Sequence, residues 1–104
     1  MAGDRYLFIT KTSLMAPIIE NWAIVSGTVK AISDHPEMEG FQQITLHLKQ
    51  SKAVDNFPNL AEADEGNDIV INVRAADLEE LNAEEGKSFK GTVRKAFGQV
   101  YFLK

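Results

Sequence analysis

Residues 68–97 read DIVINVR, AADLEEL, NAEEGK and SFKGTVRKAF, and this stretch decides the fold. Apolar and polar residues alternate over Asp68–Arg74, which predicts a half-buried strand. Asp77–Leu81 predicts a short helix, because an aspartate suits a helix N-cap and acidic residues suit the positive end of the helix dipole. Ser88–Phe97 returns to the composition of a strand. A short helix therefore separates two strands.

Two strands are predicted before this stretch and one after it. Trp22–Ile32 and Phe41–Lys49 alternate in the same manner, with a polar turn between them. Gln99–Lys104 follows Gly98 closely, as expected of a hairpin partner for the preceding strand. Between the second and third strands, Gln50–Asn67 lacks periodicity and predicts a long acidic connection.

The order of strand, strand, strand, short helix, strand, strand is the order of the OB-fold. We therefore expect a mostly β chain that forms a five-stranded Greek-key OB-fold barrel, with the first and fourth strands as neighbours. Another small barrel or a sandwich is the alternative. The predicted core consists of Val25, Val29, Ile44, Leu46, Ile71, Phe89 and Val93, with Leu78 and Leu81 of the helix covering one end.

The first strong strand contains a glycine where a side chain would normally add stability. The alternation places Ala23, Val25, Gly27, Val29 and Ala31 on one face. Because a glycine in mid-strand often marks a bend or bulge, we expect Gly27 to let this strand serve both sides of the barrel.

The length of 104 residues fits one domain with one core. We expect the barrel to span residues 22–104, and residues 1–21 to form an extension with a further strand at Arg5–Thr12. The chain has no cysteine, which excludes disulfides and thiolate sites. No signal peptide or membrane span is apparent, so the cytoplasm is the default location unless a leader has been removed.

The segments Gly27–Ile32, Gln43–Leu48 and Ala53–Pro58 resemble the first two strands of the periplasmic copper-efflux metallochaperones, which are small OB-type barrels. The resemblance covers about a third of the chain. That family holds copper(I) with a histidine, a tryptophan and a pair of methionines. Here Phe57 stands in place of the tryptophan, and no methionine follows Pro58. The resemblance therefore implies the fold, and we predict no metal site and no cofactor.

Charge is distributed unevenly along the chain. Residues 51–86 carry ten acidic and two basic residues, whereas residues 87–104 carry five basic residues and no acid. If the first and fourth strands pair, Thr28 and Lys30 share an outer surface with Lys90, Thr92 and Arg94. This surface is a candidate for binding an acidic partner or a phosphate backbone.

The residues of a catalytic site are not evident. His35 and His47 are the two histidines, and no serine or threonine stands in a recognisable nucleophile motif. His47 is predicted to face solvent on the second strand. We therefore expect no enzyme activity; a hydrolase that uses the clustered carboxylates is a disfavoured alternative.

We expect a non-catalytic binding module. A protein partner, or a homodimer formed through Arg5–Thr12, is the first hypothesis, because the acidic middle segment would repel phosphates. The alternative is single-stranded nucleic acid, bound by the basic surface of the first and fourth strands and by Phe97, since OB barrels often bind oligonucleotides. The candidate ligand-binding residues are Lys30, His47, Arg74, Lys90, Arg94 and Phe97.

Overall fold

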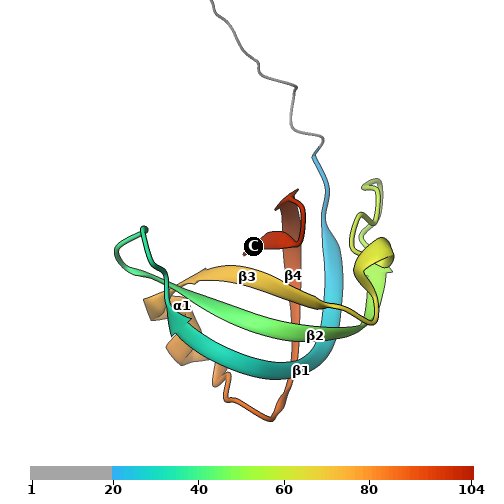
Figure 1. Ribbon diagram of the computed structural model, residues 1–104. Helices are drawn as coiled ribbons and strands as arrows, with labels where there is room; N and C mark the ends of the chain where they lie inside the picture. Colours follow the sequence, from blue (N-terminus) through green and yellow to red (C-terminus); the bar gives the residue numbers. More distant parts are fainter. Residues whose placement is uncertain (1–19) are drawn as a thin grey trace, which may run out of the picture.

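The computed structural model describes residues 20–104, which form a closed five-stranded β barrel (Figure 1). The strands follow one another around the barrel in the order β1, β2, β3, β5, β4. The predicted mostly β barrel with one short helix between the third and fourth strands is confirmed. The elements are β1 (Ala23–Asp34), β2 (Phe41–Ala53), the 3-10 turn η1 (Glu62–Asp64), β3 (Asp68–Arg74), α1 (Ala75–Leu81), β4 (Ser88–Phe97) and β5 (Val100–Leu103).

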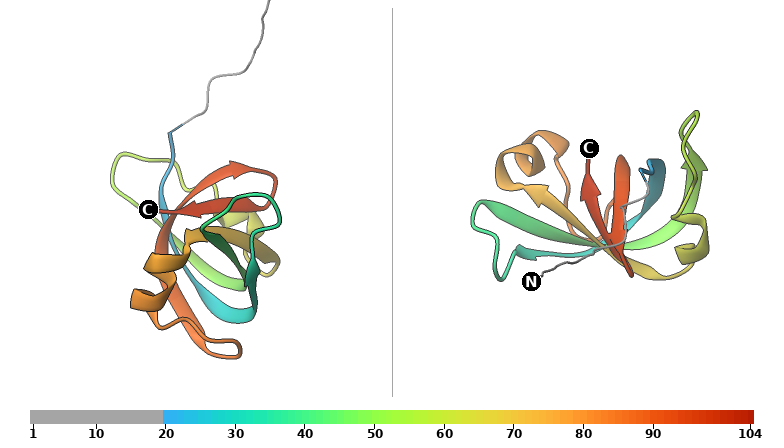
Figure 2. Two further views of the ribbon diagram at one scale, coloured as in Figure 1. Left: turned by 90° about the vertical axis from the view of Figure 1, so that its left-hand side faces the viewer. Right: turned by 90° about the horizontal axis from the view of Figure 1, so that it is seen from above.

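The strand β1 connects the two halves of the barrel. It pairs antiparallel with β2 along its length and with β4 through Ala23–Thr28, so the predicted neighbourhood of the first and fourth strands is confirmed. The barrel closes where β3 runs parallel to β5 over Val70–Asn72. Seen from above in Figure 2, the strands curve around a common interior. The predicted strand at Arg5–Thr12 lies outside the described residues.

The interior is filled by one apolar cluster. All seven barrel residues predicted for the core are buried, together with further apolar side chains such as Leu48, Ile69 and Tyr101. This burial follows from the period-two alternation, which sends every second side chain of a strand to the interior. The helix contributes less than predicted. Leu78 packs against the core, but Leu81 is 37% exposed, so the prediction that both leucines cover the barrel end is half wrong.

The predicted alternation of β1 is wrong after Val29, because the strand contains a bulge there. Val29 pairs with Leu46 and Ala31 pairs with Thr45, which leaves Lys30 as an extra residue between them. An extra residue reverses the direction of the side chains that follow it. Ala31 is therefore exposed, contrary to the prediction, and Ile32 packs against the core in its place.

Gly27 lies at a second irregularity, where β1 passes very close to β2. The register shifts between Ser26 and Gly27, and Lys49 is the extra residue on β2. A Cβ atom at position 27 would lie 2.0 Å from the carbonyl oxygen of His47. The predicted link between Gly27 and a bulge is thus confirmed, and only a residue without a side chain fits the close approach.

The helix α1 begins two residues earlier than predicted. It starts at Ala75 with Arg74 at the N-cap, and no side chain caps its first turn. Asp77 therefore lies inside the first turn and is not the cap. The helix ends at Leu81, and its C-cap residue Asn82 has a left-handed φ of 54°. No helix within residues 20–104 is long and apolar enough to cross a membrane.

Candidate functional site

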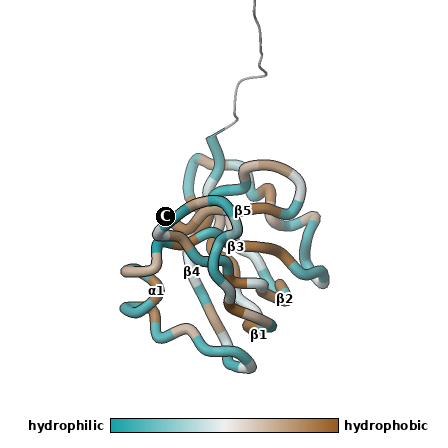
Figure 3. The backbone as a smooth tube through the Cα atoms, turned by 60° about the vertical axis from the view of Figure 1, so that its left-hand side comes forward, coloured by the Kyte–Doolittle hydropathy of each residue, from teal (hydrophilic) through white to brown (hydrophobic). Residues whose placement is uncertain are grey.

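A pocket opens on the outer surface where β3 and β5 separate. The two strands are paired as far as Asn72 and Phe102, after which β3 turns into α1 while β5 continues toward Lys104. The separation leaves a pocket of about 350 Å³. In Figure 3, α1 and the C-terminal end of β5 lie on the same side of the barrel. We call this the seam pocket; it is lined by Phe41, Asn72, Val73, Arg74, Asp77, Arg94, Phe102, Leu103 and Lys104.

The strand register explains why aromatic and basic side chains meet here. Asn72 of β3 and Arg94 of β4 both pair with Phe102 of β5, so these three residues form one row across the sheet. Phe41 pairs with Arg74 in the next row, between β2 and β3. Side chains in one row at the same face are neighbours. The pocket therefore combines aromatic surface with guanidinium groups from two strands.

Asn72 is the polar residue at the bottom of this arrangement. It is only 4% exposed, and its Oδ1 accepts a hydrogen bond of 3.1 Å from Nε2 of Gln43 on β2. The side-chain nitrogen Nδ2 of Asn72 has no hydrogen-bond partner within residues 20–104. Because a buried polar group without a partner costs free energy, this donor is suited to a ligand that carries a hydrogen-bond acceptor.

The seam pocket has a positive balance of charge. Arg74, Arg94 and Lys104 line it with a single acid, Asp77. None of the three bases is within salt-bridge distance of a carboxylate in the part of the chain that the structure describes. Lys104 instead lies over the ring of Trp22, with Nζ 5.4 Å from the ring centroid. The two arginines are thus available to an anionic ligand.

The structure brings some of the predicted binding residues together and separates others. Arg74 and Arg94 meet in the seam pocket. Lys90 lies opposite Ser26, four residues from Arg94 along β4, and lines different hollows. Phe97 is 69% exposed at the turn between β4 and β5, so it does not cap the barrel.

Lys30 and His47 form a third, separate group with Asp68. The Nδ1 atom of His47 is 2.9 Å from one carboxylate oxygen of Asp68, and Nζ of Lys30 is 3.9 Å from the other. All three side chains are about half exposed. An exposed cluster of this kind contributes little to stability, and the carboxylate of Asp68 already faces both Lys30 and His47.

A buried polar network fixes the long connection between β2 and β3 to the barrel. Asp64 of η1 is 7% exposed, and it accepts hydrogen bonds from the Tyr101 hydroxyl (2.5 Å) and from Nζ of Lys95 (3.1 Å). Burial opposes ionisation of Asp64, but these hydrogen bonds and the Lys95 charge outweigh burial and hold its pKa below the ordinary value. Burial and the bond to Asp64 raise the pKa of Tyr101 well above its ordinary value.

The connection between β2 and β3 is shorter than predicted, and two of its acidic residues are bonded within the molecule. Strand β2 continues to Ala53, four residues beyond its predicted end, and Asp64 is neutralised by Lys95 inside the molecule. The Glu65 carboxylate accepts bonds from the backbone N–H and hydroxyl of Ser51. The connection also enters β3 at Asp68, whereas the seam pocket lies at the Arg74 end of that strand. In Figure 1, the connection and α1, which follows Arg74, lie on opposite sides of the barrel.

Sequence reasoning missed Phe102 and Asn72. In the order Val100, Tyr101, Phe102, Leu103, every residue is apolar or aromatic, so alternation does not show which aromatic ring faces outward. The structure places Tyr101 inside and leaves Phe102 partly exposed. Alternation assigns Asn72 to the outer face of β3, but it does not show that neighbouring side chains cover this residue and leave it 4% exposed.

Within residues 20–104, no group of three histidine, cysteine, aspartate or glutamate side chains gathers to hold a metal ion. Comparison of the sequence with protein-family models and with curated proteins gave no match.

Proposed function

We propose that this protein is a barrel of the OB type that binds single-stranded nucleic acid at the seam pocket. The strand order and the helix between β3 and β4 support the assignment to the OB-fold, in which the face around the second and third strands binds oligonucleotides. Because a fold alone does not establish a function, the proposal depends on the pocket itself.

The observation that carries the proposal is the meeting of Phe102, Asn72 and Arg94 in one row of the sheet. An aromatic ring stacks on a base of any identity, an arginine binds phosphate, and an amide donor pairs with an acceptor on a base edge. Phe41 and Arg74 repeat the combination of ring and guanidinium in the next row. Two such rows suit consecutive nucleotides of one strand.

A single strand fits these features better than a duplex. In a duplex the faces of the bases are stacked on each other and cannot reach Phe41 or Phe102. The pocket is also a local depression of about 350 Å³ between strands, which is too small to receive a double helix. Unpaired bases can turn into it one at a time.

The acidic middle segment is a weaker objection than its sequence suggested. Asp64 is paired inside the molecule, and the connection that contains it lies at the opposite end of β3 from the pocket. Asp77 is the one acid in the lining. Against three bases, it leaves the lining positive, and phosphate contacts are favoured at low salt.

Binding to a protein partner stays a second hypothesis. Its predicted contact, Arg5–Thr12, lies outside the described residues. Light scattering of the full chain measures the mass in solution, and a strict monomer would remove the homodimer form of that hypothesis.

Fluorescence anisotropy of a labelled, unstructured oligonucleotide tests the proposal. Loss of one stacked base is worth about 1–3 kcal/mol, so Phe102→Ala should weaken binding roughly 5- to 150-fold. Arg94→Gln should weaken binding and reduce its salt dependence, because one phosphate contact is lost. Lys87→Gln is the matched control, since Lys87 is exposed and paired with Glu84 away from the pocket.

Circular dichroism of each variant establishes that it is folded at the temperature of the titration. The proposal predicts that Lys87→Gln binds as the parent does and that a duplex of the same sequence binds more weakly than the single strand. It is wrong if no binding occurs at low salt, or if Phe102→Ala and Arg94→Gln both bind as tightly as the parent.

A further inference from the structure

Two adjoining hollows cross the outer face of β4, β1 and β2, away from the seam pocket. They have volumes of about 560 and 540 Å³, and they share Ser26, Gln50 and Lys90. Together they form one continuous depression, which we call the lysine groove. Its defining residues are Ser26, Gly27, Lys49, Gln50, Lys52 and Lys90.

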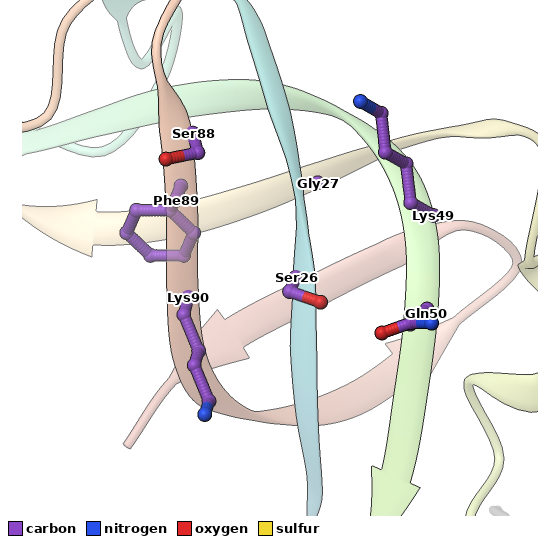
Figure 4. A pocket seen from close by; sticks show the side chains of 7 residues that line it. All are labelled: Ser26, Gly27, Lys49, Gln50, Ser88, Phe89 and Lys90. Atoms are coloured by element: carbon purple, nitrogen blue, oxygen red, sulfur yellow. The ribbon is translucent and has the colours of Figure 1, made fainter.

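The depression follows from the irregularity in β1. Gly27 has no side chain and Ser26 has a small one, so the middle of β1 forms a low floor. The neighbouring strands carry long side chains at the same level, with Lys90 opposite Ser26 on β4 and Lys49 bulged out of β2. Figure 4 shows Lys49 and Lys90 on the two sides of Ser26 and Gly27.

The walls of the groove are basic. Lys49, Lys52 and Lys90 are exposed, and none of them has a salt bridge in residues 20–104. Glu65 is the one acid in the lining, and its Oε2 atom accepts hydrogen bonds of 2.8 and 2.7 Å from the backbone N–H and hydroxyl of Ser51. Three ammonium groups against one carboxylate leave the depression positively charged, which favours an anion.

The floor offers hydrogen-bonding groups and no aromatic face. Neither the Ser26 hydroxyl nor the Gln50 side-chain amide has a hydrogen-bond partner in the described part of the chain. Phe89 borders the groove but is only 6% exposed, so its ring cannot serve as a stacking platform. The groove can therefore bind charged oxygen atoms but cannot recognise a base.

The groove is long enough for more than one anionic group. Its ends are marked by the pair Thr28 and Ser88 and by the pair Ile24 and Lys52. Four residue steps along β1 separate these pairs, which corresponds to roughly 13 Å in a strand. An extended ligand with several negative charges fits this length better than a single small ion.

We propose that the lysine groove binds a chain of linked phosphate groups through its lysines and the polar groups of its floor, independently of any base. Inorganic polyphosphate and the sugar-phosphate backbone of a nucleic acid share this chemistry. The site goes beyond the seam pocket, because it contains no aromatic ring for stacking and lies on different strands.

Isothermal titration of the full chain at low salt, with inorganic tripolyphosphate in one arm and an abasic oligodeoxynucleotide in the other, tests the site. Lys49→Gln combined with Lys90→Gln should weaken binding at least about tenfold. The same double variant should lower the salt slope for the abasic strand by about 1.4, which is the share of two phosphate contacts.

Two control variants separate the groove from general charge and from the seam pocket. Lys87→Gln removes one positive charge outside both sites and should leave binding nearly unchanged. Arg94→Gln removes a seam-pocket arginine and should not affect tripolyphosphate. Ser26→Leu fills the floor without a change of charge and should weaken binding of both probes, with circular dichroism as the check of folding.

The outcomes distinguish the sources of the phosphate. Tighter binding of tripolyphosphate assigns the groove to free polyphosphate, and tighter binding of the abasic strand assigns it to a nucleic-acid backbone. The proposal is overturned if neither probe binds, or if Lys87→Gln loses as much affinity as the groove variants. Failure of the groove proposal would leave the seam-pocket proposal standing, because both probes lack the bases that the seam pocket is proposed to bind.

Discussion

Gly27→Ala tests the close approach of β1 to β2. The added Cβ atom would lie 2.0 Å from the carbonyl oxygen of His47 and 2.9 Å from the carbonyl carbon. Both atoms belong to the backbone, so no side-chain rotation can relieve the overlap. To reach an ordinary contact of 3.4 Å, the strands would have to separate by about 1.4 Å at this point.

Backbone hydrogen bonds have donor–acceptor distances of about 2.7–3.2 Å. An added separation of about 1.4 Å would lengthen the neighbouring bonds between β1 and β2 beyond this range. Each ladder bond contributes about 0.5–1.5 kcal/mol, and each buried polar group left without a partner costs a further 1–3 kcal/mol. The loss of one or two bonds therefore predicts destabilisation of about 3–5 kcal/mol. For a domain of this size, the midpoint of thermal unfolding should fall by at least about 12 °C.

Thermal and urea unfolding followed by circular dichroism measure this loss. Gly91→Ala is the matched control, because Gly91 of β4 is followed by Thr92, Val93 and a basic residue just as Gly27 of β1 is followed by Thr28, Val29 and a basic residue. The atoms nearest to a Cβ atom there are side-chain atoms of Phe89 and Leu103, at 3.0–3.2 Å, and side chains can shift where backbone cannot. The control should lose about 1 kcal/mol, the low end of the cost of overpacking. Equal stability of Gly27→Ala and the parent would contradict the close approach of β1 to the backbone of β2.

Three further predictions concern the rest of the molecule. Tyr101→Phe removes a buried hydrogen bond to Asp64 and should lower the free energy of unfolding by about 1.5–3 kcal/mol in urea titrations; a loss below 0.5 kcal/mol would contradict the network. Because the pKa of Asp64 is lowered on folding, its ionised form adds stability above about pH 4, and this stability is lost as the pH falls through the lowered value. The difference in stability between the parent and Asp64→Asn should therefore narrow in acid, and a constant difference from pH 7 to pH 2 would be inconsistent with this assignment. Phe97→Ser should change the unfolding free energy by less than about 0.5 kcal/mol, since the ring is 69% exposed; a larger loss would mean that the ring is packed.

The period-two alternation was sufficient to predict the barrel. Residues such as Val25, Ile44 and Val93 are apolar at every second position, and burial of one face of each strand follows directly from that pattern. The bounds of β3 and β4 were predicted to the residue. Alternation fails at Ala31, because the bulge at Lys30 depends on how β1 pairs with a strand distant in sequence.

The candidate site was predicted less well, because it depends on register. Arg74 and Arg94 were both proposed as binding residues, but the pairing of β3 and β4 with β5 is what brings them to one pocket. Lys90 was placed with Arg94 because both face outward on β4, yet Lys90 belongs to the lysine groove. The alternation rule assigns a face and not a position along the barrel.

The buried network of Asp64, Lys95 and Tyr101 could not be predicted from the sequence. Asp64 lies in a segment whose acidic composition predicts solvation, and its partners Lys95 and Tyr101 are more than thirty residues away in sequence. Nothing local distinguishes Asp64 from Glu62 or Glu65. Its burial results from the way the connection between β2 and β3 folds back over β4 and β5.

The most direct measurement is the change in backbone amide chemical shifts when the ¹⁵N-labelled protein is titrated with an unstructured single-stranded oligonucleotide. If single-stranded nucleic acid binds at the seam pocket, the largest changes should cluster at Phe41, Asn72, Arg74, Arg94 and Phe102. Changes confined to other surfaces, or no changes at concentrations that saturate typical single-strand binding proteins, would contradict binding at this pocket.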